Sequence, residues 1–211
     1  NIILKKPTNE TQTSASITYS QPEEGGGTLK STQFFSSGAL VDDELLYTFA
    51  LDVSDKNIWI VKDDNKSINP QSGQNRGGFN TNFAWLASDI DTLSFGLSYL
   101  KDDRHDPDAS NPDYDSFFDS KKLTASVNHT RQWDWGESDS NYFYERSSIH
   151  QNNSHPLVDE ADTAQTNHNF DTKLLMPLND NHSLTTGLSY SHTTIDNTRD
   201  YDKSYSVSQG A

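Results

Sequence analysis

The chain has 211 residues and a formal net charge of −15, because 31 Asp and Glu residues outnumber 16 Lys and Arg residues. So acidic a chain repels phosphate backbones, which excludes nucleic acid as an expected partner, and the absence of cysteine excludes disulfides and thiolate metal sites. No apolar run approaches the roughly 18 to 20 residues that a membrane-spanning helix needs, whereas the strands of a membrane barrel alternate and hide their apolarity.

The chain begins at Asn1, with neither an initiator methionine nor a signal peptide. We interpret it as a processed chain or as a segment excised from a longer protein, so no targeting sequence indicates its compartment. The aromatic fraction of 11% is too high for a disordered tail, and we therefore expect a folded chain.

Apolar and small polar residues alternate along several segments, which is the pattern of strands with one apolar face. The clearest segment is 93–99 (LSFGLSY), which places its large side chains on one face and its serines and glycine on the other. No segment shows sustained helical spacing, so we expect an all-β fold. The alternating segments are, in chain order, 14–19, 45–53, 79–85, 93–99, 123–127 and 184–190.

Two kinds of connection separate these predicted strands. Short clusters of turn-forming residues occur at 41–44, 88–91, 134–137 and 179–182. They recur about every 45 residues, which is the length of two strands, one short turn and one long loop. The predicted long loops are rich in Asp, Asn, Ser, Gly and Pro, and they span 21–29, 55–77, 101–121, 149–168 and the chain from 193 onward.

Strands of roughly 9 to 11 residues, one-sided apolarity, and connections that alternate between short and long are together typical of an outer-membrane β-barrel. Trp85, Trp133 and Trp135 lie beside short turns. Tyr99 and Tyr190 close the opposite ends of their strands, so the rings would form two interfacial girdles. A soluble β-sandwich whose aromatic residues fill a core is the alternative that the pattern leaves open.

The alternation also predicts which side chains of a barrel face lipid and which face the lumen. The predicted outward residues are Leu93, Phe95, Leu97, Leu184 and Leu188, and the predicted lumen residues are Ser94, Gly96, Ser98, Gly187 and Ser189.

Four segments carry a more specific signal, namely 1–7 (NIILKKP), 36–42 (SSGALVD), 131–138 (RQWDWGES) and 170–178 (FDTKLLMPL). In their order and spacing they resemble the TonB-dependent outer-membrane receptors, in particular the branch that takes up ferric catecholate siderophores and binds certain colicins. The first is similar to the end of that family's plug domain, the second to its second strand and first periplasmic turn, the third to a later periplasmic turn, and the fourth to the strand before the next turn. The family usually has proline where this chain has Ala39.

The resemblance implies an antiparallel transmembrane β-barrel of 22 strands, with short periplasmic turns and long extracellular loops. We expect this chain to hold about nine to ten of those strands, with residues 1–7 as the end of the plug and its connection to the barrel, and residues 8–211 as the N-terminal part of the barrel. The implied location is the bacterial outer membrane.

The resemblance also implies a function, which is the transport of a ferric siderophore of the catecholate type into the periplasm. The siderophore would be the transported ligand, and no cofactor is expected. The implied partners are the plug domain, the TonB energy-coupling complex, lipopolysaccharide, and bacteriocins or phage. Two alternatives are a porin-class barrel and a secreted acidic β-sandwich used for adhesion. No hydrolase, zinc-protease or phosphate-loop motif occurs, so we expect neither an enzyme nor a metal site.

A ferric catecholate is anionic and aromatic, so its site needs cationic groups and aromatic faces. The predicted long loops offer both, and Arg104, Tyr114 and Lys122 belong to the same one, where they could converge. The candidate ligand-binding residues are Arg76, Arg104, Tyr114, Lys121, Lys122 and Arg146.

Overall fold

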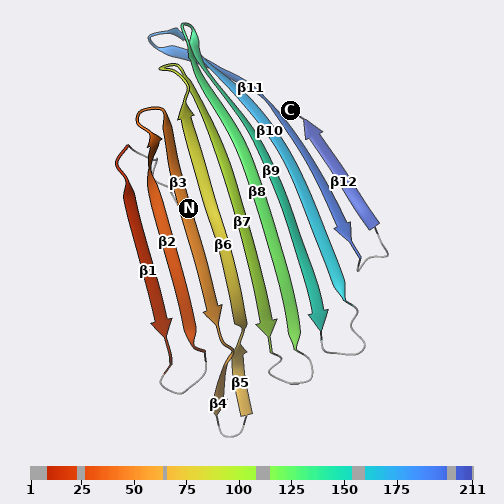
Figure 1. The fold of residues 1–211 in the computed structure, drawn as a ribbon. Helices are drawn as coiled ribbons and strands as arrows, with labels where there is room; N and C mark the ends of the chain where they lie inside the picture. The colour runs from red at the N-terminus through yellow and green to blue at the C-terminus, as the bar shows by residue number, and fades with distance from the viewer. Residues whose placement is uncertain are drawn as a thin grey trace.

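The computed structural model describes residues 9–22, 27–63, 66–107, 115–153, 160–198 and 203–210. The predicted plug segment 1–7 and Tyr114 lie outside these residues. Within them, ten strands form one antiparallel sheet in the order β1-β2-β3-β6-β7-β8-β9-β10-β11-β12, and β4 and β5 form a separate hairpin (Figure 1). No helix in the described part of the chain is long and apolar enough to cross a membrane.

The strands of the main sheet are β1 (Gln12–Ser20), β2 (Leu29–Val41), β3 (Leu45–Lys56), β6 (Gly73–Leu86), β7 (Asp91–Asp106), β8 (Ser116–Trp133), β9 (Gly136–Asn153), β10 (Ala161–Asn179), β11 (His182–Asn197) and β12 (Lys203–Gly210). The small hairpin consists of β4 (Trp59–Asp63) and β5 (Lys66–Gln71).

All four short turns lie where the sequence predicts them, at the top of Figure 1. In the first, Glu44 N donates a hydrogen bond to Val41 O at 3.2 Å, and Asp43 adopts a left-handed φ of 57°. Aspartate tolerates that conformation better than most residues. The connections at the opposite ends of the strands are the longer ones, so the alternation of short and long connections is confirmed.

The predicted extent of the long loops is wrong. Strands β7 to β11 have 16 to 19 residues each, instead of roughly 9 to 11. The predicted loop 101–121 is mostly strand, because β7 continues to Asp106 and β8 begins at Ser116. Beyond Tyr99 both faces of the sheet carry polar side chains, so the hydrophobic alternation ends although the backbone ladder continues.

The pairing register separates the side chains into two faces, because directly paired residues point to the same side of a sheet. We call one the apolar face. One row across it consists of Tyr47, Phe83, Phe95, Val127, Tyr142, Phe170 and Tyr190.

We call the opposite side the polar face, and Asn82, Gly96 and Ser126 form one of its rows. Its neighbours fit closely around the glycine, because a Cβ on Gly96 would lie 2.5 Å from Ser126 Oγ and 2.9 Å from Asn82 Oδ1. The predicted division between Leu93, Phe95, Leu97, Leu184 and Leu188 on one face and Ser94, Gly96, Ser98, Gly187 and Ser189 on the other is confirmed.

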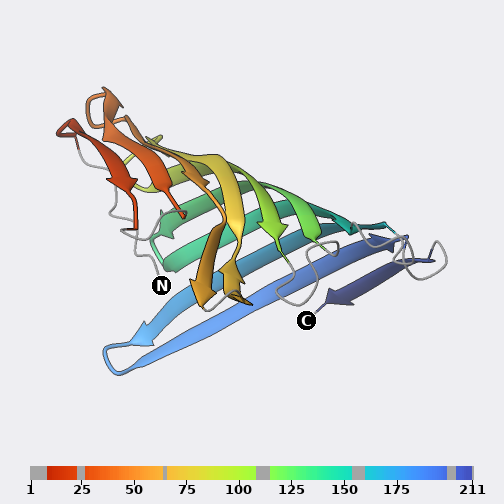
Figure 2. The ribbon, with the colours of Figure 1, turned by 90° about the horizontal axis from the view of Figure 1, so that it is seen from below.

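The sheet is curved and open, with β1 and β12 as its unpaired edges (Figure 2). Among the described residues Ala161 is the only buried hydrophobic side chain, and Phe95, Leu97 and Leu188 are 41 to 56% exposed. A soluble sandwich would bury such a face against a second large sheet. The sandwich alternative is therefore not favoured, because no second large sheet covers the apolar face within the described residues.

Candidate ligand-binding site

The structure places five of the predicted ligand-binding cations in strands instead of loops, and the sheet divides them between its faces. Arg76 pairs with Asp102, and Lys122 pairs with Leu100, both on the polar face. Arg104 lies on the same face, two residues beyond Asp102. Tyr114 lies outside the described residues.

Lys121 and Arg146 lie on the opposite, apolar face. Lys121 is two residues from Leu123 on β8, and Arg146 pairs directly with Leu123 across the β8–β9 ladder. Side chains on opposite faces of one sheet cannot converge on one ligand. The five cations lie in strands and not in the predicted loops, and the sheet separates Lys121 and Arg146 from Arg104 and Lys122.

Arg104 is held against an aromatic ring on the polar face. Its guanidinium carbon lies 4.6 Å from the centroid of the Phe118 ring, and Nη2 lies 2.9 Å from Asp106 Oδ2. The Arg104 side chain is still 47% exposed. Exposed ion pairs contribute about 0 to 1 kcal/mol, so an anionic ligand can compete with Asp106 for this guanidinium.

Asp102 lies beside Arg104 and is bound from the neighbouring strand. Gln74 Nε2 donates to both carboxylate oxygens of Asp102 at 2.8 Å. Arg76, directly opposite Asp102 in the ladder, has no ion-pair partner among the described residues. Its exposed guanidinium is therefore available to an anion.

Lys122 is anchored to a carboxylate that is only 18% exposed. Lys122 Nζ lies 2.7 Å from Glu145 Oε2, and Asn167 Nδ2 donates to Glu145 Oε1 at 3.4 Å. These contacts fix Glu145 on the polar face, whereas the lysine side chain is 47% exposed. The ammonium group therefore stays within reach of a ligand in front of the sheet.

A hollow of about 420 Å³ opens on the polar face beside these residues. A cation, an aromatic ring and hydrogen-bonding groups together suit an anionic aromatic ligand. The lining residues are Asp102, Arg104, Phe118, Ser120, Ile149, Gln151 and Thr163.

Sequence reasoning missed the supporting roles of Gln74, Asp102 and Glu145. The period-two pattern could have found them, because counting outward from Gly96 and Ser98 places Asp102 on the polar face.

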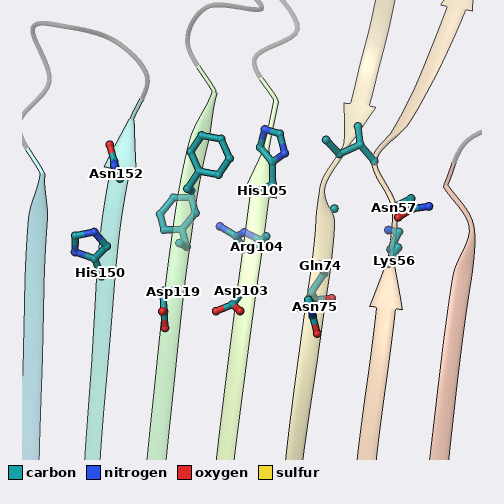
Figure 3. Close-up of a pocket in the computed structure, with 14 residues that line it drawn as sticks. Lys56, Asn57, Gln74, Asn75, Asp103, Arg104, His105, Asp119, His150 and Asn152 are labelled. Carbon is teal, nitrogen blue, oxygen red and sulfur yellow. The ribbon is translucent and has the colours of Figure 1, made fainter.

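A larger hollow of about 720 Å³ lies at the ends of β3 and β6 to β9 (Figure 3). Asn75, Asp103, Asp119 and His150 form one row along it, which belongs to the apolar face. Arg104 and Phe118 line this hollow as well as the smaller one, whereas Asp103 and Asp119 would repel an anionic ligand along their row. No group of three or more possible metal-binding side chains occurs among the described residues.

No family model matches the sequence, and no curated protein matches it. Solved structures match its fold. The siderophore receptor PirA from Pseudomonas aeruginosa matches with a TM-score of 0.72 and 15% identity, over 97% of this chain and 33% of that protein. A mutant ferric enterobactin receptor, PfeA, from the same species, in complex with enterobactin, matches with a TM-score of 0.75 and 16% identity, over 93% of this chain and 33% of that protein.

The outer membrane transporter YddB from Escherichia coli matches with a TM-score of 0.65 and 15% identity, over 97% of this chain and 36% of that protein. The chain thus spans about a third of the length of the structures it matches. The fold is an all-β, open antiparallel sheet that matches barrel segments of TonB-dependent siderophore receptors.

Proposed function

We propose that this chain forms part of the barrel wall of a TonB-dependent receptor in the bacterial outer membrane, and that the receptor carries a ferric siderophore into the periplasm. The apolar face would contact lipid and the polar face would line the lumen. The single observation that carries the proposal is the cationic and aromatic cluster on the polar face of a sheet with this fold. We propose transport without catalysis.

The cluster suits a siderophore of the catecholate type. Arg76, Arg104 and Lys122 offer positive charge toward the lumen, and Phe118 offers a ring beside Arg104. A ferric catecholate complex combines negative charge with aromatic rings, so both kinds of group would contribute to its binding. The plug domain, the TonB energy-coupling complex, and bacteriocins or phage are proposed partners on the same basis.

A porin-class barrel has less support. The matching solved structures are described as siderophore receptors and a transporter, and none of the three reported above is described as a porin. A water-filled channel requires only a polar lining, whereas this polar face also holds the Arg104 guanidinium against the Phe118 ring.

Binding of a ferric catecholate to the purified full-length protein tests the proposal. We expect Arg104→Gln combined with Lys122→Gln to raise the dissociation constant about ten- to a hundredfold, because two charge-assisted contacts are lost. Ligand quenching of protein fluorescence measures the constant, and heat-modifiable migration on a gel verifies barrel assembly.

The matched control is Lys121→Gln combined with Arg146→Gln, which removes two charges from the apolar face. We expect this control to bind the ferric catecholate as the parent does. If the parent does not bind a ferric catecholate, the proposed catecholate type of the siderophore is refuted. If the Arg104 and Lys122 double variant binds normally, these two residues do not form the site.

A further inference from the structure

The apolar face carries two imidazole rings where its neighbouring strands carry apolar side chains. One row across this face contains Leu97 on β7 and Ala125 on β8, and the same row continues through β9 to His168 on β10 and His192 on β11. Ionisable side chains are costly on a face that meets lipid, and where they occur there they mark functional sites. The two histidines therefore need an explanation other than coverage of the sheet.

The two histidines are direct neighbours. His168 and His192 pair across the β10–β11 ladder, and their ring centroids lie 6.4 Å apart. Directly paired residues of a sheet hold their Cβ atoms about 4.5 to 5.5 Å apart. This spacing is close to the roughly 5 to 6 Å between residues one turn apart on a helix, which is the arrangement in which two histidines of a zinc-protease helix bind one metal ion. Both imidazoles are therefore within reach of a single ion.

A hydroxyl group lies against one ring nitrogen of each histidine. Tyr142 Oη lies 2.8 Å from His168 Nδ1, and Ser208 Oγ is hydrogen-bonded to His192 Nδ1. When Nδ1–H donates to such an oxygen, the neutral imidazole keeps its lone pair on Nε2. Metal-binding histidines usually have a hydrogen-bond partner on the second nitrogen, which fixes the tautomer and the orientation of the ring.

The Nε2 atoms, by contrast, are weakly engaged. His168 Nε2 has no hydrogen-bond partner among the described residues. His192 Nε2 lies 3.3 Å from both Thr194 Oγ1 and Ser206 Oγ, which is just beyond the usual range for a hydrogen bond from nitrogen. Little is lost when the two rings turn so that both Nε2 atoms point at one ion. Both residues are only half-buried, so water has access to complete the coordination.

We propose that His168 and His192 form a two-histidine site for a divalent transition-metal ion, with water as the remaining ligands. Imidazole nitrogen suits copper, zinc and nickel, and Cu²⁺ binds a given nitrogen site most tightly of these. The site consists of two side chains, which is fewer than the groups of three or more that are absent from the described residues.

This site differs from the sequence expectation of no metal site, because only the register between β10 and β11 brings the two histidines together. It lies on the opposite face from Arg104 and Lys122, so the inference does not rest on the proposed siderophore function.

The test titrates Cu²⁺ into the metal-free, purified full-length protein in a nonionic detergent, at about pH 7.5, where most of the imidazole is neutral. Equilibrium dialysis counts the bound ions, and electron paramagnetic resonance detects the nitrogens that bind them. The double variant combines His168→Gln with His192→Gln. The matched control combines His129→Gln with His182→Gln, because neither of these histidines pairs with a second imidazole.

We expect the parent to bind one more Cu²⁺ per chain than the double variant, and the difference between their resonance spectra to show coupling to two imidazole nitrogens. The second imidazole acts at a high effective concentration, so His192→Gln alone should weaken this binding about a hundredfold. Tyr142→Phe removes the hydrogen bond to His168 Nδ1 and should weaken it about tenfold. The control should bind Cu²⁺ as the parent does.

Equal numbers of bound Cu²⁺ ions in the parent and in the double variant would overturn the inference, as would an equal loss in the control. Coupling to a single nitrogen in the difference spectrum would overturn it as well. The spectrum of the parent needs no substitution, so it tests the pair even if a variant fails to assemble. Ferric catecholate binding is measured on the same preparations. A double variant that loses Cu²⁺ and keeps the ferric catecholate supports a separate site, and a parent that binds only Cu²⁺ supports this inference while it refutes the proposed catecholate type.

Discussion

At the scale of single residues, the face on which a charged side chain lies determines what it can contact. Lys121 and Lys122 are adjacent in the sequence, but Lys121 pairs with Lys101 on the apolar face, whereas Lys122 reaches Glu145 on the polar face. The sequence contains this distinction, because Lys121 is two residues from Leu123 and Lys122 is two residues from Thr124. Polar residues on both faces do not predict that a strand continues, so hydrophobicity alone does not assign Lys121 and Lys122 to opposite faces.

A contact between β9 and β10 also raises the pKa of a histidine, His150, near the ends of these strands. His150 Nδ1 lies 2.7 Å from Asp162 Oδ1, and this hydrogen bond raises the pKa of the imidazole above its usual 6.5. Because the pKa is higher in the folded state, the stabilisation by the pair is complete below about pH 6.5 and is lost as the pH rises through the folded-state pKa.

We expect Asp162→Asn to lower the pKa of His150 toward 6.5, because the neutral amide no longer favours the imidazolium. An NMR titration of the His150 ring in the full-length protein measures the change. Asp139→Asn, on the polar face of β9, is the control and should leave the titration unchanged. An identical His150 titration in the parent and in Asp162→Asn would show that the pair does not form.

At the scale of elements, the sequence was sufficient for the turns and for those parts of the strands that have an apolar face. The cluster Asp134-Trp135-Gly136 marks its turn through residue types that favour turns, and the stacked Trp133 and Trp135 rings, 5.7 Å apart, lie beside it as expected. The strand segments beside the long connections, which lie at the lower end of Figure 1, could not be recognised from hydrophobicity. From Lys101 to Asp106 the strand is defined only by its backbone pairing with β6 and β8, which side-chain polarity does not reveal.

The turn between β8 and β9 depends on a glycine that a neighbouring strand approaches closely. A Cβ on Gly136 would lie 2.1 Å from the carbonyl oxygen of Leu175 on β10, which is backbone and cannot move aside. We expect Gly136→Ala to destabilise the folded protein by about 1 to 3 kcal/mol, the usual cost of overpacking. Urea unfolding of the full-length protein in lipid measures the change.

Gly77→Ala is the matched control for this substitution. A Cβ on Gly77 would meet only Val53 Cγ2, at an ordinary 3.9 Å, so we expect little change beyond the general effect of replacing a strand glycine. Equal stability of the two variants would contradict the close approach of β10 to this turn.

At the scale of the whole molecule, the sheet cannot satisfy its own surfaces. Within the part of the chain that the structure describes, β1 and β12 have unpaired backbone edges and nothing covers the apolar face. A barrel in a membrane satisfies both requirements, because closure pairs the edges and lipid covers the apolar face. The resemblance noted in the sequence and the fold match agree on this architecture, whereas the siderophore and the partners are proposals that depend on it.

The measurement that tests this architecture most directly compares spin labels at Leu97 and Ser98, neighbours on opposite faces of β7, in the full-length protein in a bilayer. We expect oxygen, which concentrates in lipid, to relax the label at position 97 more strongly than the label at position 98. A water-soluble nickel chelate should show the reverse preference. Equal accessibility of the two labels to both reagents would contradict a sheet that separates lipid from a polar lumen.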